Sequence, residues 1–248
     1  MMKSCLISIL VSLASFTTAW GQASGTQVTE TDSTLTLRNS KVRVEFPKGE
    51  AFDISKLTLN GKELVLSKGY NTVPWTLTYK GPQGENPVLF PSHGEYAGWA
   101  KTTKDGHVAI AFKWNMRLTY QDLVPVVMTV SLPGDSELAY WDIQAGTPDG
   151  WLVSNTQFPR ITVTRPDKAK LITSAGWGAE YNLSNPQVYT SSYPSVTGSM
   201  QLLLLHNPDG SVYYATEDRE ACGKDFRAAV GDKSVTLLTD IVASEGWS

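Results

Sequence analysis

The sequence predicts an all-β protein in which antiparallel strands build a two-sheet sandwich. Short segments alternate apolar and polar residues, turn residues separate these segments, and almost no segment shows the 3.6-residue period of an amphipathic helix. Parallel strands need long crossover connections, which are usually helical, so a parallel α/β sheet is excluded. A sandwich or a barrel remains, and two sheets packed face to face in a single domain are the simplest arrangement.

Residues 1–23 have the pattern of an export leader. Lys3 supplies a basic start, an apolar run extends from Leu6 to Phe16, and small residues allow cleavage after Gly21 or after Ala23. The apolar run is too short to span a bilayer. We expect a soluble domain over residues 24–248 that is secreted or periplasmic. The alternative for the first residues is a buried N-terminal helix.

The composition of residues 24–248 excludes several classes of partner. Removing Lys3 from 21 basic residues leaves 20 against 24 acidic residues, a balance of −4, and no basic stripe occurs. Nucleic acid and membrane surfaces are therefore not expected partners. Cys222 is the only cysteine after the leader, so an internal disulfide is not available and the core must hold the domain together.

Two pairs of strands near the start are the clearest local features. Alternation over Lys41–Phe46 places Val42, Val44 and Phe46 on one face, and a preceding strand covers Thr34–Leu37. Segments 54–59 and 62–66 are joined by Asn60-Gly61, a pair that favours a type I′ turn because both central positions need positive φ. These segments predict half-buried antiparallel strands.

A second hairpin is predicted over Met200–Tyr214. The strands Met200–Leu205 and Val212–Tyr214 flank the turn-forming sequence Asn-Pro-Asp-Gly at 207–210. For Glu217–Ala229 a helix is the alternative to a loop followed by a strand, but Gly223 favours the strand. Residues 81–91 are expected to be a loop-like insertion within one domain. Further strands are expected at 76–79, 107–114, 126–132, 138–143, 161–164, 224–229 and 234–240.

The usual catalytic motifs are absent from the sequence. His93, His107 and His206 are isolated, and no zinc-binding spacing, Gly-x-Ser-x-Gly elbow or P-loop occurs. Cys222 lies in a charged loop where it could be exposed, yet a lone thiol is more often incidental than nucleophilic. We therefore expect no catalytic residue, no metal and no cofactor.

Acidic residues cluster after the second hairpin. Glu217, Asp218, Glu220 and Asp225 are close in sequence, and glycoside hydrolysis needs only two carboxyl groups facing each other across a sugar. Adjacent loop carboxylates more often form a solvated face. Calcium is the alternative ligand, although no calcium-loop spacing supports it. Glu217 and Asp218 are thus candidates for a cleft edge.

Aromatic residues in predicted loops favour carbohydrate as the ligand. Pyranose rings stack on aromatic side chains while polar groups bind their hydroxyls. Trp177 and Tyr181 share a Gly-containing loop, and Trp99 and Trp151 lie in other loops. The alternative is that these side chains close the ends of the core. Two further tryptophans, Trp114 and Trp141, lie inside predicted strands and are expected in the core.

The order of these motifs is similar to that in a family of sugar-processing domains. The patterns are Leu-x-Leu-x-Asn-x-x-Val-x-Val at 35–44, Leu-x-Leu-Asn-Gly-Lys-Glu-Leu at 57–64, Ser-Asn-Thr-Gln-Phe-Pro-Arg-Ile at 154–161, and the stretch 193–218. They resemble the galactose mutarotase-like β-supersandwich that forms the N-terminal domain of bacterial multi-domain glycoside hydrolases of the endo-α-N-acetylgalactosaminidase-related type.

This resemblance implies a catalytic (β/α)₈ barrel after the sandwich. A barrel needs about 200 to 250 further residues, so the chain, ending at Ser248, is expected to be a truncated member whose C-terminus could be incomplete. Free-standing mutarotases would have an Asn-His-x-x-Phe type motif, which is absent here.

The expected function is an exported, non-catalytic β-sandwich domain that supports or completes the glycan cleft of a glycoside hydrolase. One alternative is a stand-alone carbohydrate-binding module. Another is a self-contained mutarotase or lyase, which would need a histidine and a carboxylate in one concave pocket.

Overall fold

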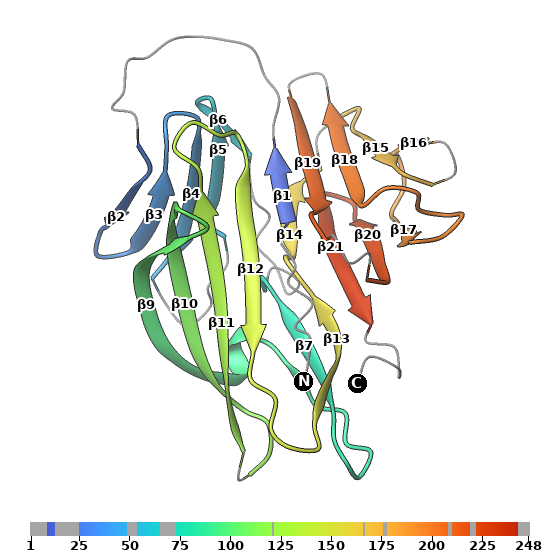
Figure 1. Ribbon diagram of the computed structural model, residues 1–248. Coiled ribbons are helices and arrows are strands. Elements are labelled where there is room, and N and C mark those ends of the chain that lie inside the picture. Colours follow the sequence, from blue (N-terminus) through green and yellow to red (C-terminus); the bar gives the residue numbers. More distant parts are fainter. Residues whose placement is uncertain are drawn as a thin grey trace.

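The computed structural model describes residues 9–12, 25–48, 54–64, 73–120, 122–165, 167–175, 178–207, 210–218 and 222–242. These residues form strands and turns, with a single 3-10 turn, η1 (Pro91–His93). Every strand pairing among them is antiparallel (Figure 1). The all-β antiparallel prediction is therefore confirmed. Within the described residues, no helix is long and apolar enough to cross a membrane.

The largest sheet has nine strands and forms one layer of the sandwich. Their order is β16-β15-β18-β19-β1-β12-β11-β10-β9. The bounds, in that order, are Ala179–Asn182, Lys170–Thr173, Leu202–Asn207, Gly210–Thr216, Ile9–Ser12, Ala139–Ala145, Leu123–Leu132, His107–Arg117 and Gly94–Lys104.

The other layer consists of two smaller sheets. In the seven-stranded sheet the order is β17 (Gln187–Tyr193), β20 (Lys224–Val230), β21 (Ser234–Val242), β13 (Leu152–Gln157), β7 (Thr76–Lys80) and β8 (Val88–Leu89), and β14 (Ile161–Thr164) also pairs with β21. The five-stranded sheet has the order β2 (Gln27–Glu30), β3 (Thr34–Arg38), β4 (Val42–Pro47), β5 (Lys56–Leu59) and β6 (Lys62–Leu64). The expected second sheet is thus divided in two.

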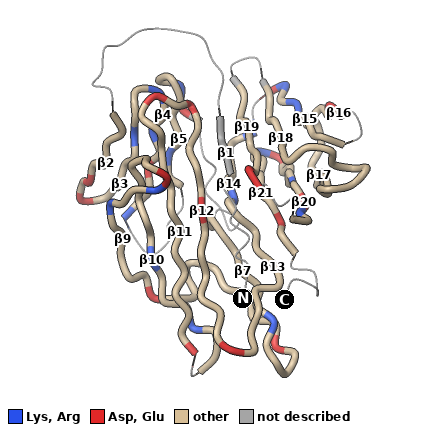
Figure 2. The backbone as a smooth tube through the Cα atoms, in the orientation of Figure 1, with Lys and Arg blue, Asp and Glu red and all other residues tan. Residues whose placement is uncertain are grey.

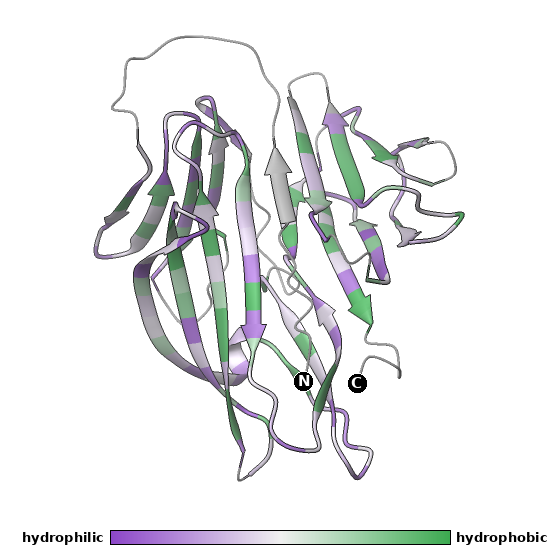
Figure 3. Cartoon of the chain, viewed as in Figure 1, coloured by the Kyte–Doolittle hydropathy of each residue, from purple (hydrophilic) through white to green (hydrophobic). Residues whose placement is uncertain are grey.

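One continuous apolar core joins the nine-stranded sheet to both smaller sheets. Against the five-stranded sheet, the ring of Phe112 lies 4.8 Å from that of Phe46. Against the seven-stranded sheet, the ring of Tyr214 lies 6.5 Å from that of Phe226. Figure 3 shows apolar and polar residues alternating along many strands, as expected when one face of each strand is buried.

Both predicted hairpins are confirmed. Asn60 and Gly61 have φ of 46° and 78°, the left-handed values that a type I′ turn requires. In the second hairpin, β18 pairs with β19 up to Asn207 opposite Gly210, and residues 208 and 209 lie outside the described residues. Trp114 and Trp141 are buried in the core as predicted.

Some segments assigned to loops are strands. Trp99 lies in β9, an edge strand of eleven residues whose exposed polar positions weaken the alternation that would predict it. Residues 179–182 form β16, and Val88 and Leu89 form the short strand β8 within the predicted insertion. The helix alternative is wrong for residues 224–229, because β20 buries every second side chain.

The predicted leader contains a described strand. Ile9–Ser12 forms β1, which pairs with β12 on one side and with β19 on the other. The structure thus shows a strand where the alternative interpretation had a helix. Leader cleavage remains a prediction.

The buried hydroxyl of Tyr79 should make the folded protein less stable at alkaline pH. Its ring is buried, its hydroxyl donates to the carbonyl oxygen of Gly146 at 2.8 Å, and burial raises its pKa to about 12. A raised folded-state pKa stabilises the protein fully below the unfolded value of 10.0, and this stabilisation is lost as pH rises towards 12.

We expect Tyr79→Phe to reduce the fall in unfolding free energy between pH 8 and pH 11 by about 1.4 kcal/mol. Urea denaturation at several pH values measures this fall. Tyr120→Phe, at an exposed ring, is the control and should keep the native pH dependence. If Tyr79→Phe and the native chain lose the same unfolding free energy between pH 8 and pH 11, this assignment is contradicted.

Candidate functional site

A polar cluster lies on the outer face of the seven-stranded sheet. Strand register places Asp240 of β21 between Asp225 of β20 and Gln157 of β13. The neighbouring residues Phe226 and Thr239 point into the core, where the Thr239 hydroxyl contacts the hydroxyl of Tyr214. Because successive side chains of a strand alternate between faces, Asp225 and Asp240 project from the opposite face.

Asp240 is the centre of this cluster, although only 3% of the residue is exposed. Its carboxylate accepts hydrogen bonds from the amide of Asn155 and, at 3.5 Å, from that of Gln157. The guanidinium of Arg227 lies 3.1 Å from Asp240 and 3.2 Å from Asp225. Side chains from three strands therefore share one hydrogen-bonded network, which we call the Asp240 cluster (Asn155, Gln157, Asp225, Arg227 and Asp240).

Arg160, which follows β13, extends the charge of this cluster. Burial lowers its pKa, and the negative charge of Asp240 opposes that effect. Among the described residues, the Nε atoms of Arg160 and Arg227 are buried without a hydrogen-bond partner. Buried donors are normally satisfied, so a water or a ligand oxygen is needed to complete these bonds.

A hollow of about 300 Å³ opens beside the Asp240 cluster. It is lined by Ser192, Tyr193, Gly223, Lys224, Asp225, Asp240 and Val242. The carboxylate of Asp225 is partly exposed beside the hollow, whereas the ammonium of Lys224 is buried in an ion pair and does not face it.

A buried ion pair supports one wall of the hollow. Lys224 Nζ lies 2.6 Å from Asp218 Oδ2, and their side chains are 0% and 3% exposed. Gln201 accepts a second bond from Lys224 Nζ at 2.8 Å, and Asp218 accepts the backbone N–H of Cys222 at 2.7 Å. The carboxylate of Asp218 is thus engaged inside the protein.

Cys222 is buried, contrary to the possible exposure that its charged sequence neighbours suggested. The bond from its N–H to Asp218 holds this end of the loop against the ion pair. Glu217, by contrast, is exposed. Burial raises the pKa of Tyr140 and of Tyr213, and Glu217 adds to both shifts, which places its charge near the outer face of the nine-stranded sheet.

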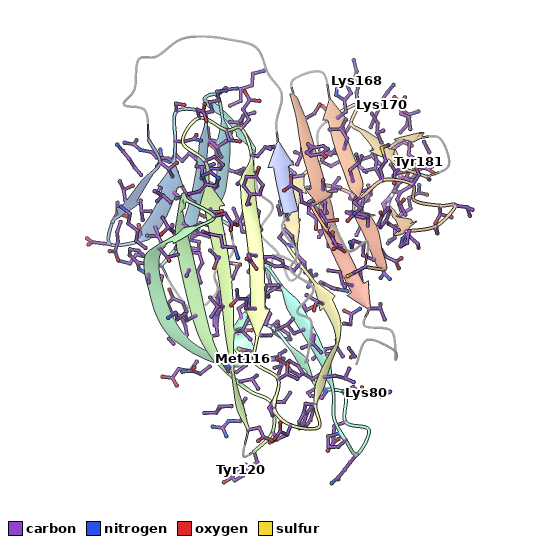
Figure 4. The ribbon with its side chains drawn as sticks, in the orientation of Figure 1. Lys80, Met116, Tyr120, Lys168, Lys170 and Tyr181 are labelled. Carbon is purple, nitrogen blue, oxygen red and sulfur yellow. The ribbon has the colours of Figure 1, made fainter. Side chains whose placement is uncertain are left out.

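The candidate aromatic residues do not form one platform. Tyr181 is half-buried in β16 at one edge of the nine-stranded sheet, with its ring 4.7 Å from that of Tyr189 (Figure 4). Trp99 lies in β9 at the opposite edge and packs against the core. Trp151 also packs against the core. Trp177 lies outside the described residues.

The histidines are also scattered. His93 lies in η1, near one end of β10, whereas His107 begins β10 at its other end and His206 lies in β18. Within the described residues, no group of three or more His, Cys, Asp or Glu could hold a metal ion. The three histidines therefore do not contribute to one common site.

The Asp240 cluster was not predicted from the sequence. In the sequence, Asn155 and Gln157 belong to the pattern at 154–161, and Asp240 ends a predicted strand. Two polar residues at i and i+2 in a strand share a face, which is the available signal. That signal does not indicate that residues 85 positions apart, Asn155 and Asp240, will meet.

The cluster is better suited to binding than to hydrolysis. Asp225 and Asp240 lie side by side on neighbouring strands and share one guanidinium, whereas glycosidase carboxyl groups face each other across the sugar. Asp240 is also too buried for its oxygens to reach a glycosidic bond. Among the residues that the structure describes, Figure 2 shows acidic and basic side chains dispersed over both layers, without a stripe of one sign.

No family model matches the chain. Over 244 residues, 98% of the chain, it is 38% identical to a Bacteroides thetaiotaomicron protein named putative glycoside hydrolase, but the match covers only 36% of that protein. The chain is similar to part of a larger carbohydrate-active protein.

Solved structures agree on the fold. The α-N-acetylgalactosaminidase NagBb from Bifidobacterium bifidum matches as a quadruple mutant with a TM-score of 0.64 and 11% identity, over 85% of this chain and 34% of NagBb. Its ligand-free form matches with a TM-score of 0.54 and 11% identity, over 84% and 33%. At this identity the likeness shows the fold alone. The chain spans about a third of the length of these proteins.

The Lys224–Asp218 pair yields a stability prediction. Removing one partner leaves the other charge buried, so we expect Asp218→Asn or Lys224→Met to reduce the unfolding free energy by about 3 to 5 kcal/mol. Urea denaturation measures the loss. Lys170→Met is the matched control, because the Lys170–Glu180 pair has the same 2.6 Å separation but is 42% and 52% exposed.

The control should lose no more than about 1 kcal/mol. Replacing both buried partners, as in Asp218→Leu with Lys224→Met, should recover part of the stability because no unpaired charge remains. Equal losses for Lys170→Met and Lys224→Met would contradict the structural role of the buried pair.

Proposed function

We propose that this chain is a non-catalytic β-sandwich domain of a longer, exported glycoside hydrolase. In this role it is the galactose mutarotase-like supersandwich that precedes and supports a catalytic barrel. The observation that carries the proposal is the asymmetric match, which covers 98% of this chain but 36% of the relative named as a glycoside hydrolase. The fold-level match to 34% of NagBb supports the same division.

The local chemistry supports a non-catalytic role. Asp218 and Asp240 are buried with internal partners, and Asp225 shares the guanidinium of Arg227 with Asp240. A glycosidase needs an accessible acid and an accessible nucleophile or base. In this proposal the catalytic carboxyl groups come from the barrel.

The substrate class follows from the chemistry of the Asp240 cluster. Its carboxylate, amide and guanidinium groups match the hydroxyl and acetamido groups of a glycan. NagBb is named for its action on α-linked N-acetylgalactosamine, so an aryl α-N-acetylgalactosaminide is a rational first probe. The Asp240 cluster would line the edge of the substrate cleft, and the predicted leader would place the protein in the periplasm or outside the cell.

A hydrolysis assay tests whether catalysis requires the part of the longer protein that lies outside this chain. We expect the longer protein to release p-nitrophenol from p-nitrophenyl α-N-acetylgalactosaminide and the 248-residue chain to release none. The physical reason is that Asp218 and Asp240 are buried with internal partners and Asp225 shares one guanidinium with Asp240, so that the catalytic carboxyl groups are expected from the barrel. Turnover by the purified 248-residue chain would refute the non-catalytic role, and a panel of other aryl glycosides distinguishes a wrong sugar from an inactive protein.

Substitutions in the Asp240 cluster test the cleft assignment. In the longer protein, Asp225→Asn should raise KM up to about tenfold, the effect of one lost charge-assisted bond, with little change in kcat. Asp225→Asn leaves the Arg227–Asp240 pair in place, so folding should be retained, as a thermal melt can verify.

The matched control for this series is Glu45→Gln. Glu45 pairs with Arg43 at 2.7 Å, two residues apart on one strand as Asp225 and Arg227 are, but it lies in the five-stranded sheet. The control should leave KM unchanged. An unchanged KM in Asp225→Asn would remove the Asp240 cluster from the cleft without affecting the accessory-domain proposal.

A further inference from the structure

The nine-stranded sheet is continuous only because β1 fills a position between β12 and β19. Ile9, Leu10 and Val11 are opposite Trp141, Tyr140 and Ala139 of β12, and residues 9–12 are opposite residues 216–213 of β19. Since β1 is antiparallel to both neighbours, β12 and β19 run parallel to each other. Without β1 they would be about 9.5 Å apart, twice the strand spacing, and could not share hydrogen bonds.

This position, which we call the β12–β19 slot (backbone of residues 139–141 and 213–216), lies over the centre of the core. Trp141 and Tyr214 flank it, and they are 1% and 0% exposed. An empty slot would leave the backbone N–H and C=O groups on both sides without partners beside this apolar interior. Such groups are almost always paired in folded proteins.

The sequence predicts that the present occupant is removed. Residues 9–12 belong to the apolar run of the predicted leader, and cleavage after Gly21 or Ala23 would release them from the domain. An exported form of this domain therefore needs another strand in the slot. The pairing pattern specifies what fits there.

The slot requires a strand with a defined pattern. Positions opposite Trp141 and opposite Ala139 face the core, because both residues are buried on that side, whereas the position opposite Tyr140 faces outward. The occupant must therefore have apolar residues at its first and third positions. It must also run antiparallel to β12.

We propose that the β12–β19 slot is a strand-docking site that, after leader removal, receives an extended segment of the same polypeptide from beyond Ser248. The proposal rests on the longer protein of the proposed function. The match covers only 36% of the relative, which leaves ample chain to supply a strand. In Figure 1, β21 runs downward and β1 upward, so a segment that turns back after β21 has the direction that the slot requires.

Hydrogen exchange tests whether the slot depends on its occupant. In the uncleaved 248-residue chain, Val11→Pro removes a backbone donor from a central strand, so we expect amides at 139–141 and 213–216 to exchange at least roughly tenfold faster. Thr18→Pro, in the same leader but outside β1, is the control and should leave these amides as protected as in the native chain. Unchanged protection in Val11→Pro would overturn the role of β1.

The exported, leader-cleaved longer protein tests the proposed occupant. We expect the same amides to be protected there, and a photo-crosslinking residue at Tyr140 to link to a peptide from beyond Ser248 within one polypeptide. Unprotected amides, a link to a second copy of the protein, or no link to that part of the chain would each overturn the proposal. Hydrogen exchange and crosslinking do not depend on hydrolysis. The slot proposal can therefore fail or succeed independently of the hydrolysis assay that tests the proposed function.

Discussion

Burial of the inner face of the nine-stranded sheet is the constraint on which the rest of this structure depends. Tyr214 packs towards the seven-stranded sheet, whereas Trp141 and Phe112 pack towards Phe46 of the five-stranded sheet. Cys222 is the only cysteine after the predicted leader, so no disulfide can replace these contacts within residues 24–248. Apolar burial must therefore offset the entropy of ordering the chain. Disrupting the nine-stranded sheet would therefore disturb its packing against both smaller sheets.

The same requirement explains the two polar networks. Lys224 and Asp218 are fully removed from water, which is tolerated because Gln201 and the Cys222 backbone satisfy their remaining bonds. Asp240 is similarly surrounded by donors, but its network includes the partly exposed Arg227 and Asp225 and faces a hollow. The first network is closed off from solvent, whereas the second reaches the surface through Arg227 and Asp225.

In the proposed function this chain is an accessory domain, and its polar clusters support that proposal. The partly exposed groups of the Asp240 cluster suit recognition of hydroxyls, and its two carboxylates share one guanidinium. Residues 9–12 fill the β12–β19 slot in this structure, and the further proposal assigns the slot to a strand from a following segment once the leader is removed. A domain that takes a strand from a following segment would be physically tied to that segment, which is consistent with a role in supporting a neighbouring catalytic unit.

The local sequence pattern was sufficient to predict much of the fold. Residues adjacent in sequence are enough to predict the alternation in β4, the Asn60-Gly61 turn and the burial of Trp114. The reason is that the side-chain period of a strand and the φ values of a turn are local properties. Strand β9 was missed because an edge strand exposed to solvent does not need a regular apolar period. The division of the second layer into two sheets also has no local signal.

The sequence by itself therefore determined the all-β class, two hairpins and the core positions of Trp114 and Trp141. Only the tertiary structure decided that Asn155 meets Asp240, that Asp218 is buried against Lys224 while Glu217 stays exposed, and that residues 9–12 lie between β12 and β19. The physical reason is that these contacts join segments far apart in the chain. Their formation depends on strand order and register, which are set by packing across the whole sandwich and not by any one segment.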